Sequence, residues 1–424
     1  MSSPSNKAQE VETQPVSKYI EEEIPVEALE DSDSAKRIIS IDFVKGLAMV
    51  FIILAHAAFA WLDAEWRHAY GLVFAFLDIL GPSLFVFLSA LSVVFSIKRK
   101  KKTTSHKAIR SRILTRGLVI MIIGVIFNPM SLITSGEGGV AFPLNLWGWN
   151  ILMFVGFAQI LSYYALKFSK VARAIIGIII IFISPILREL LYTFKVAPVG
   201  EWNFLSIVDI LHFIITSPLP QVPLLPYFSI CFLSTLFGEM LYDAMNGPKG
   251  AYNKLYKNFL RWGIFLVVVG LIMGFRLLPE AATQTDFWKT EYIHVQLLRI
   301  ANQQNYIHYP GILDLMIRGT SSNMIYNLGA ALLLIAVSFY YLDIKRKSNN
   351  VLKMVIFYGT SSLSLFLIQY MFLPLYLGQF PITFFFFPVA GYIGFLGFLM
   401  YLWIRYFNGV GTPEWIMTQL GKKT

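Results

Sequence analysis

Ten long apolar segments decide what this chain can fold into. They lie at approximately 40–62, 70–97, 113–133, 149–168, 172–193, 222–244, 257–277, 323–343, 352–378 and 382–407. Each can cross a hydrocarbon core of roughly 30 Å as a helix that rises about 1.5 Å per residue. Because lipid offers the backbone no hydrogen-bond partners, helices are the expected elements. The sequence therefore predicts an all-α, polytopic helical membrane bundle with about ten transmembrane helices.

Composition supports a membrane protein and excludes several other classes. Hydrophobic residues make up 56% of the chain and charged residues only 14%, whereas soluble domains carry about a quarter charged residues. These values exclude a soluble enzyme, a disordered protein and a nucleic-acid-binding module. Cys231 is the only cysteine, so no intramolecular disulfide can form, and we expect no metal site.

The charges are unevenly distributed along the chain. Residues 1–36 hold nine acidic residues and three lysines, show no apolar periodicity and are expected to form a disordered acidic tail in the cytoplasm. The segment lacks the basic start and apolar core of a signal peptide, so the first apolar segment is predicted to act as a signal anchor. The chain then divides into a membrane domain at 37–409 and a short cytoplasmic tail at 410–424.

Positive charges gather in alternate loops. Basic stretches follow the second, fourth, sixth and eighth apolar segments and end the chain. The positive-inside rule places these loops, and with them both termini, in the cytoplasm. The other loops then face outward. The longest of them, 278–322, contains His294 and His308, and a loop of this length usually has a function or packs as a lid.

The stretch 37–92 contains three ionisable residues in or beside lipid: His56 and Asp78 in the first two apolar segments, and His68 at the outer rim in the loop between them. Such residues are costly there and suggest function by default. His56 lies roughly 9 Å and Asp78 roughly 12 Å below the outer face on neighbouring antiparallel helices, so the two are predicted to pair. A carboxylate orients an imidazole and raises its basicity, as a general base requires. The alternatives are a structural histidine bonded to a backbone carbonyl for His56 and an ordinary surface histidine for His68.

The cytoplasmic ends of the helices offer candidates for anion binding. Asp42 and Lys45 lie three residues apart at the start of the first helix and can interact on one helical face. Lys45 could receive an anionic ligand, although spacing alone favours a lysine that anchors the helix. Arg116, inside the third segment, is the better candidate. For the run 98–102, contact with anionic lipid headgroups is the favoured explanation.

The start of the membrane domain resembles the first-helix signature of transmembrane acyltransferases. The stretch RIISIDFVKGLAMVFIILAH opens with Arg37, Asp42, Lys45 and Gly46 in the spacing of that signature. His56 follows Lys45 by eleven residues, the place of a histidine in the acyltransferase type 3 branch.

The next stretch resembles the heparan-α-glucosaminide N-acetyltransferase branch. His68-Ala69, Asp78 and Pro82 match its motif without a gap. In that branch the histidine is catalytic and the aspartate supports it. Later stretches up to residue 378 resemble the superfamily more loosely. Two positions depart from the pattern of the superfamily. Lys45 replaces its usual arginine, and Gln369 replaces a histidine that many members have at that position.

The resemblance implies transfer of an acyl group, commonly acetyl, from cytosolic acyl-CoA to a sugar-type acceptor at the outer side of the membrane. His68 would react, Asp78 would orient it, and His56 is the competing candidate. Lys45 and Arg116, with Asp42 beside them, would dock the CoA phosphates. Acetyl-CoA is thus expected as a donor substrate, with no permanently bound cofactor. The expected partners are the bilayer, acyl-CoA and a sugar or glycoconjugate, and a homodimer stays open.

Two other classes of function stay open at this point. A proton-coupled transporter or lipid flippase also suits ten helices with an intramembrane histidine and aspartate. A catalytically inactive sensor or scaffold is suggested by Lys45 and Gln369. Without cysteine pairs or a cleavable signal, the chain is expected in a prokaryotic plasma membrane.

Overall fold

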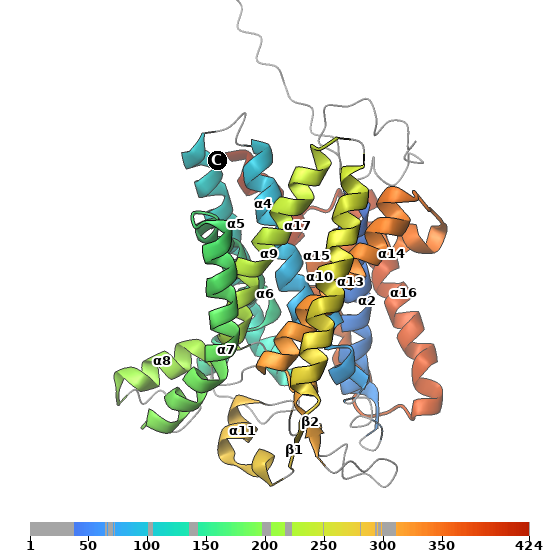
Figure 1. Cartoon of the computed structure of the whole chain (residues 1–424). Helices are drawn as coiled ribbons and strands as arrows, with labels where there is room; N and C mark the ends of the chain where they lie inside the picture. Colours follow the sequence, from blue (N-terminus) through green and yellow to red (C-terminus); the bar gives the residue numbers. More distant parts are fainter. Residues whose placement is uncertain are drawn as a thin grey trace, which may run out of the picture.

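The computed structural model describes residues 38–63, 66, 71, 73–100, 105–134, 143–196, 205–216, 223–248, 250–279, 281–292, 295, 298 and 311–423. Within these residues the chain is almost entirely helical and forms one bundle (Figure 1). The predicted all-α class is confirmed. The acidic tail at 1–36 lies outside the described residues, as do His68, His294 and His308.

The bundle is built mainly from long helices. They are α2 (Ile39–Trp61), α4 (Pro82–Lys100), α5 (His106–Thr134), α6 (Ile151–Ala165), α7 (Lys170–Phe194), α9 (Leu224–Met245), α10 (Ala251–Gly274), α13 (Ser321–Phe339) and α16 (Ile382–Phe407). Shorter helices are α8 (Ile207–Ile215), α11 (Asp286–Glu291), α14 (Asn350–Thr360), α15 (Ser362–Phe372) and α17 (Pro413–Lys423). Single helical turns lie at η2 (Asp78–Leu80), η3 (Leu144–Leu146), η4 (Ala282–Gln284), η5 (Asp314–Met316), η6 (Tyr340–Ile344) and η7 (Leu373–Tyr376).

A small layer, which we call the cap, closes the lower end of the bundle in Figure 1. Its strands β1 (Leu277–Leu278) and β2 (Ile312–Leu313) pair antiparallel, and η4, α11 and η5 complete it. The cap has its own apolar cluster, which includes Leu278, Ile312 and Ile317. The described part of the predicted outer loop 278–322 is therefore a packed layer.

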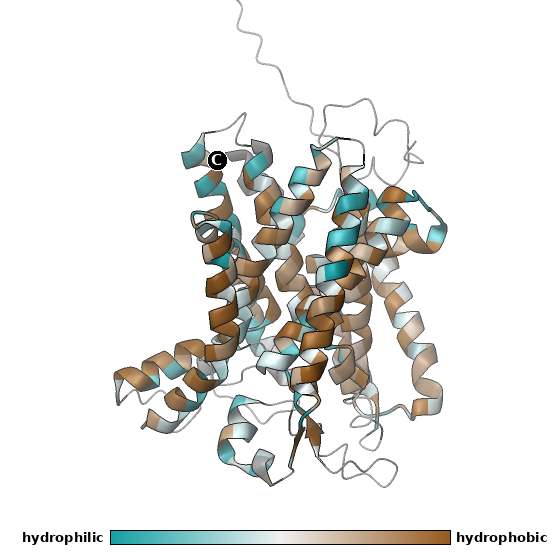
Figure 2. Cartoon of the chain, viewed as in Figure 1, coloured by the Kyte–Doolittle hydropathy of each residue, from teal (hydrophilic) through white to brown (hydrophobic). Residues whose placement is uncertain are grey.

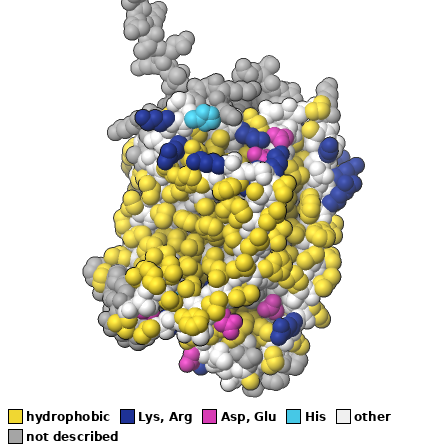
Figure 3. All heavy atoms as spheres, turned by 60° about the vertical axis from the view of Figure 1, so that its left-hand side comes forward, with side chains coloured by type: hydrophobic (Ala, Val, Ile, Leu, Met, Phe, Trp, Pro, Cys, Tyr) yellow, Lys and Arg dark blue, Asp and Glu magenta, His cyan; other side chains and the backbone are white. Residues whose placement is uncertain are grey.

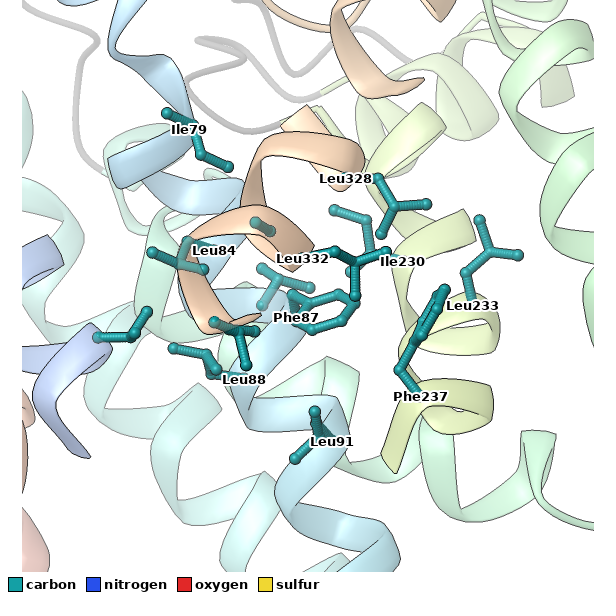
Figure 4. Close-up of a cluster of buried hydrophobic side chains, with 14 of the residues drawn as sticks. Ile79, Leu84, Phe87, Leu88, Leu91, Ile230, Leu233, Phe237, Leu328 and Leu332 are labelled. Carbon is teal, nitrogen blue, oxygen red and sulfur yellow. The ribbon is translucent and has the colours of Figure 1, made fainter. Parts of the chain in front are cut away.

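The middle of the bundle is apolar inside and outside. In the core, Phe87 and Leu91 of α4 pack with Phe237 of α9 and Leu332 of α13 (Figure 4). Apolar side chains also cover the outer surface between the two ends, as on α7, where Ile186 is 58% exposed (Figures 2 and 3). A surface of this kind suits lipid, because the side chains exposed at this level are mostly apolar.

Lysine and arginine side chains gather at the upper end of the bundle (Figure 3). We call this the basic end. It holds the start of α2, the end of α4, where Lys98 pairs with Asp243 at 3.0 Å, and the start of α7, where Lys170 lies near Glu239. The distribution agrees with the alternation of basic loops in the sequence.

The number of membrane spans differs from the expectation. Six of the described helices are long and apolar enough to cross a membrane, namely α2, α7, α9, α10, α13 with η6, and α16. The pair α14 and α15 adds a seventh if it is counted as one span, while α4 and α6 contain only shorter apolar stretches. All ten predicted segments contain helix, but the count of about ten spans is not confirmed.

Two predicted helices are broken. Segment 70–97 is interrupted at η2, and α4 begins only at Pro82, whose ring leaves no N–H to continue a helix from before it. Segment 352–378 is bent by 86° between α14 and α15. Within the predicted cytoplasmic tail at 410–424, the helix α17 packs against α15 and α5 and buries Met417; the predicted domain bounds stay a prediction.

Helix α14 lies against α2 with almost no space between the two backbones. A Cβ atom added to Gly359 would stand 1.7 Å from the carbonyl oxygen of Asp42, and one added to Gly46 would stand 1.7 Å from that of Val355. Backbone atoms cannot move aside as a flexible side chain can. These two glycines therefore permit the contact that fixes α14 on α2.

Replacing Gly359 by alanine is expected to destabilise the bundle by about 1–3 kcal/mol, because the added methyl group forces two helices apart. Thermal unfolding of the purified protein in detergent measures the effect as a lower Tm. Gly394→Ala in α16 is the matched control, since no atom lies within 4 Å of its added Cβ. Equal Tm values for the two variants would contradict the close contact.

Candidate active site

His56 is half-buried in the lower part of α2 and faces α15. Its Nε2 atom lies 3.4 Å from the hydroxyl of Tyr370, and the two rings are 5.1 Å apart. Phe366 covers another side of the imidazole at 6.1 Å. The Nδ1 atom is buried and makes no hydrogen bond to the described residues. A half-buried imidazole can exchange a proton or form a bond to a substrate.

Gln369, which replaces a frequent histidine of the superfamily, lies next to the same imidazole. It is fully buried, its Nε2 donates to the carbonyl of Phe366 at 3.1 Å, and its Oε1 has no partner among the described residues. The structure thus brings two positions singled out in the sequence, 56 and 369, to one place.

The lower end of α2 is hydrogen-bonded to the end of α15 and to the segment that leads into α16. The indole N–H of Trp61 donates to the carbonyl of Leu373 at 2.8 Å. Backbone bonds then join α2 to the segment after η7, from Gly378 to Ala60 at 2.8 Å and from Phe380 to Trp61 at 2.9 Å. This short parallel bridge fixes the height of Tyr370 relative to His56.

Asp78 lies in the break between the two helical parts of segment 70–97 and is 3% exposed. Its Oδ1 accepts hydrogen bonds from Nε and Nη2 of Arg318 at 2.8 and 2.5 Å. Its Oδ2 accepts one from Asn327 at 3.0 Å. Asn327 also reaches Asn323 at 3.1 Å and Ser83 at 3.4 Å. The carboxylate is therefore fixed by a charged partner from the cap side and an amide from α13.

The predicted pair of His56 and Asp78 was wrong. Both lie toward the lower end of the bundle, as the depth argument expected, but the oxygens of Asp78 are taken by Arg318 and Asn327. The charge of Arg318 also acts on His56, so this arginine links the two candidate residues. His68, the third member of the predicted group, lies outside the described residues.

The candidates at the basic end stay spread over two elements. Asp42 and Lys45 lie on the first turns of α2. The carboxylate of Asp343 in η6 caps the start of this helix, because it accepts hydrogen bonds from the N–H groups of Ile39 at 3.0 Å and Ser40 at 3.1 Å. Arg116 lies on α5 with an exposed side chain, within electrostatic reach of Glu414.

Glu414 of α17 closes the free end of α15. Its Oε1 accepts the N–H groups of Leu363 at 3.0 Å and Ser364 at 3.1 Å, and its Oε2 accepts the hydroxyl of Ser364. The bend at Ser361 frees these N–H groups, and the carboxylate supplies the acceptors that a continuous helix would provide.

A second buried charge group fastens the cap to the bundle. Glu291 at the end of α11 receives Nε of Arg188 from α7 at 3.3 Å and faces Nε2 of His212 from α8 at 2.7 Å. The ring of Tyr292 lies 4.1 Å from the Arg188 guanidinium. These residues bind three elements to one another, and Arg188 also reaches the turn after Arg318, since a Cβ atom added to Gly319 would stand 3.2 Å from its Nη1.

Sequence reasoning missed Arg318, Asn327, Tyr370 and Glu414. Only Arg318 gave a signal, as a lone arginine directly before an apolar segment. In the described residues no group of three His, Cys, Asp or Glu side chains is placed to hold a metal ion.

The family described as "Heparan-alpha-glucosaminide N-acetyltransferase, catalytic" matches residues 37–267, more than half of the chain. The chain belongs to this family. None of the curated proteins compared with it matches. The match contains every predicted site residue and ends within α10, so Arg318, Asn327, Gln369 and Glu414 lie beyond it.

Membership confirms the resemblance read from the first two segments. Together with the apolar helices, it identifies an integral, multi-pass membrane protein and a transferase of the acetyltransferase class. The expected prokaryotic plasma membrane has no support from the match and stays a prediction.

We expect the attachment of α17 to depend on pH. Burial raises the pKa of the Glu414 carboxyl above its ordinary value, and the hydrogen bonds from Ser364 oppose this shift. For a carboxyl whose pKa is raised on folding, the stabilisation is complete below the unfolded-state pKa and is lost as pH rises through the folded-state pKa. Wild-type α17 should therefore open more readily at pH 8 than at pH 5.

Hydrogen exchange of the peptides around 363 and 414 measures this opening. Glu414→Gln has no charge to bury, so its opening should not change with pH. The protection of its peptides against hydrogen exchange, relative to wild type, should therefore increase from pH 5 to pH 8. Glu414→Ala should lose protection at both values, by about 1–3 kcal/mol for the unpaired N–H groups. A constant ratio between wild type and Glu414→Gln would contradict the buried carboxyl as the cause.

Proposed function

We propose that the protein transfers an acetyl group from cytosolic acetyl-CoA to a sugar-type acceptor at the other side of the membrane. The observation that carries this proposal is the family match over residues 37–267, which includes His56, His68 and Asp78. Acetyl-CoA acts here as a substrate and leaves as CoA after each transfer.

The distribution of charge supports the direction of transfer. If the basic end faces the cytosol, as the positive-inside rule requires, Lys45 and Arg116 meet the donor from that side. His56 and Asp78 lie toward the opposite end, where the acceptor would arrive. The pantetheine arm would then extend along α2 toward His56.

Two roles for a histidine fit this site. As a general base it takes a proton from the acceptor amine or hydroxyl while that group attacks the thioester carbonyl, and CoA leaves as the thiol. As a nucleophile it accepts the acetyl group first and passes it to the acceptor in a second step. By the family resemblance His68 is the reacting residue, and His56 is its competitor.

The second candidate function is a proton-coupled transporter or flippase. The bend between α14 and α15 favours it, because broken helices near the centre of the bundle line the binding sites of many carriers. The buried imidazole of His56 lies against the broken pair. Acetyl-CoA turnover separates the two functions, since a carrier has no use for the thioester.

Transfer of label from radiolabelled acetyl-CoA to a panel of glucosamine acceptors tests the proposal in nanodiscs. We expect His68→Ala to reduce transfer by about 10²–10⁴-fold, the usual contribution of a general base. Asp78→Asn should reduce it less, because the imidazole remains. Loss of transfer only in His56→Ala would assign the reaction to α2. A folded wild-type sample that neither binds nor turns over any acyl-CoA would favour the transporter.

Donor binding gives a separate prediction for the basic end. Arg116→Ala is expected to raise the KM for acetyl-CoA about tenfold without lowering kcat, because a lost phosphate contact weakens binding by about 1.4 kcal/mol. Arg261→Ala is the matched control, since Arg261 is also exposed and also stands ten residues after the first residue of its helix, α10. Equal KM values for both variants would remove Arg116 from the donor site.

A further inference from the structure

Asp78 receives three hydrogen bonds from two residues that lie 240 and 249 positions later in the chain. Arg318 takes Oδ1 with two of its N–H groups, and Asn327 takes Oδ2. Neither residue belongs to the part of the chain that matches the family. The best-supported carboxylate of the candidate site is thus held from outside the matched region.

We propose that Arg318 is a positioning residue for the transfer reaction, which fixes the Asp78 carboxylate so that it can orient the reacting histidine. The inference rests on the proposed acetyl transfer. Asn327 assists by holding the second oxygen. Arg318 acts through Asp78 and makes no bond to a substrate in this assignment.

The shape of the guanidinium explains why an arginine is used. Its planar guanidinium directs two N–H groups to Oδ1 of Asp78, while Asn327 donates to Oδ2, so that both oxygens of the carboxylate are held. A lysine would supply the same charge through one ammonium group on a flexible side chain and would fix the carboxylate less firmly. Asp78 is 3% exposed, and a carboxylate buried this deeply requires a partner of opposite charge.

Gly81 lies beside the ion pair. A Cβ atom added there would stand 3.1 Å from the carbonyl oxygen of Asp78 and in ordinary van der Waals contact with Oδ1 of Asp78 and Nη2 of Arg318.

Arg318 itself stands on a rigid turn between η5 and α13. Gly319 adopts a left-handed conformation with φ of 90°, and its N–H donates to Asn323 at 3.3 Å. Thr320 caps α13 and donates its hydroxyl to the backbone carbonyl of Asp314 at 3.0 Å. Because Asn323 also accepts from Asn327, the turn and both partners of Asp78 form one network.

The same guanidinium acts electrostatically on His56. Arg318 is 21% exposed along its side chain, in contrast to Asp78.

The test uses the full chain in nanodiscs and measures kcat and KM for acetyl transfer to glucosamine. We expect Arg318→Gln to lower kcat about 100-fold, the usual cost of a displaced reacting group, with little change in the KM for acetyl-CoA. Arg318→Lys should recover part of the loss. Arg276→Gln, a change at an exposed arginine beside β1, is the control and should keep the wild-type kcat.

A double-mutant cycle separates positioning from general stability. If Arg318 acts through Asp78, the pair Asp78→Asn with Arg318→Gln should have the kcat of Asp78→Asn alone. The double variant has no unpaired buried charge. If Arg318→Gln does not fold, the double variant and Arg318→Lys are compared with Asp78→Asn instead. Additive losses in the cycle, or an Arg318→Gln variant with wild-type kcat, would overturn the assignment. A folded wild-type protein without any transfer would instead refute the proposed function.

Discussion

A backbone N–H group inside a bilayer must find its acceptor within the protein, because lipid provides none. Two helix starts at the basic end meet this requirement with carboxylates from distant segments. Asp343 accepts the first N–H groups of α2, and Glu414 accepts those of α15. These bonds supply the acceptors at the start of each helix, while the bridge between Trp61 and Phe380 holds the opposite ends of α2 and α15 together beside His56 and Tyr370.

The pair of Asp78 and Arg318 is governed by a different balance. The free energy needed to remove two charges from water is nearly as large as the free energy gained from their attraction, so a buried ion pair contributes little net stability. What the pair supplies is geometry, since the carboxylate keeps one orientation while three hydrogen bonds hold it. The cap side of the bundle is thereby joined to the first two segments, in which the family resemblance is strongest.

The sequence was sufficient for the helical class, for the approximate position of most helices and for the family. Apolar length and two spaced motifs carry that information. Hydrophobicity could not reveal the breaks at Asp78 and Ser361, because both segments remain apolar through the bend and the compensating groups come from elsewhere. The depth argument placed His56 and Asp78 toward the same end of the bundle. It could not foresee that Arg318, from 240 residues away, would take the carboxylate.

The position of Glu414 has a consequence for biosynthesis. The acceptor for the first N–H groups of α15 lies about fifty residues later in the chain, in α17. During translation α15 is made before that carboxylate, so its N-terminal turn must depend on water or lipid headgroups until α17 has been synthesised. This part of the bundle is therefore completed only after α16 and α17 have followed α15.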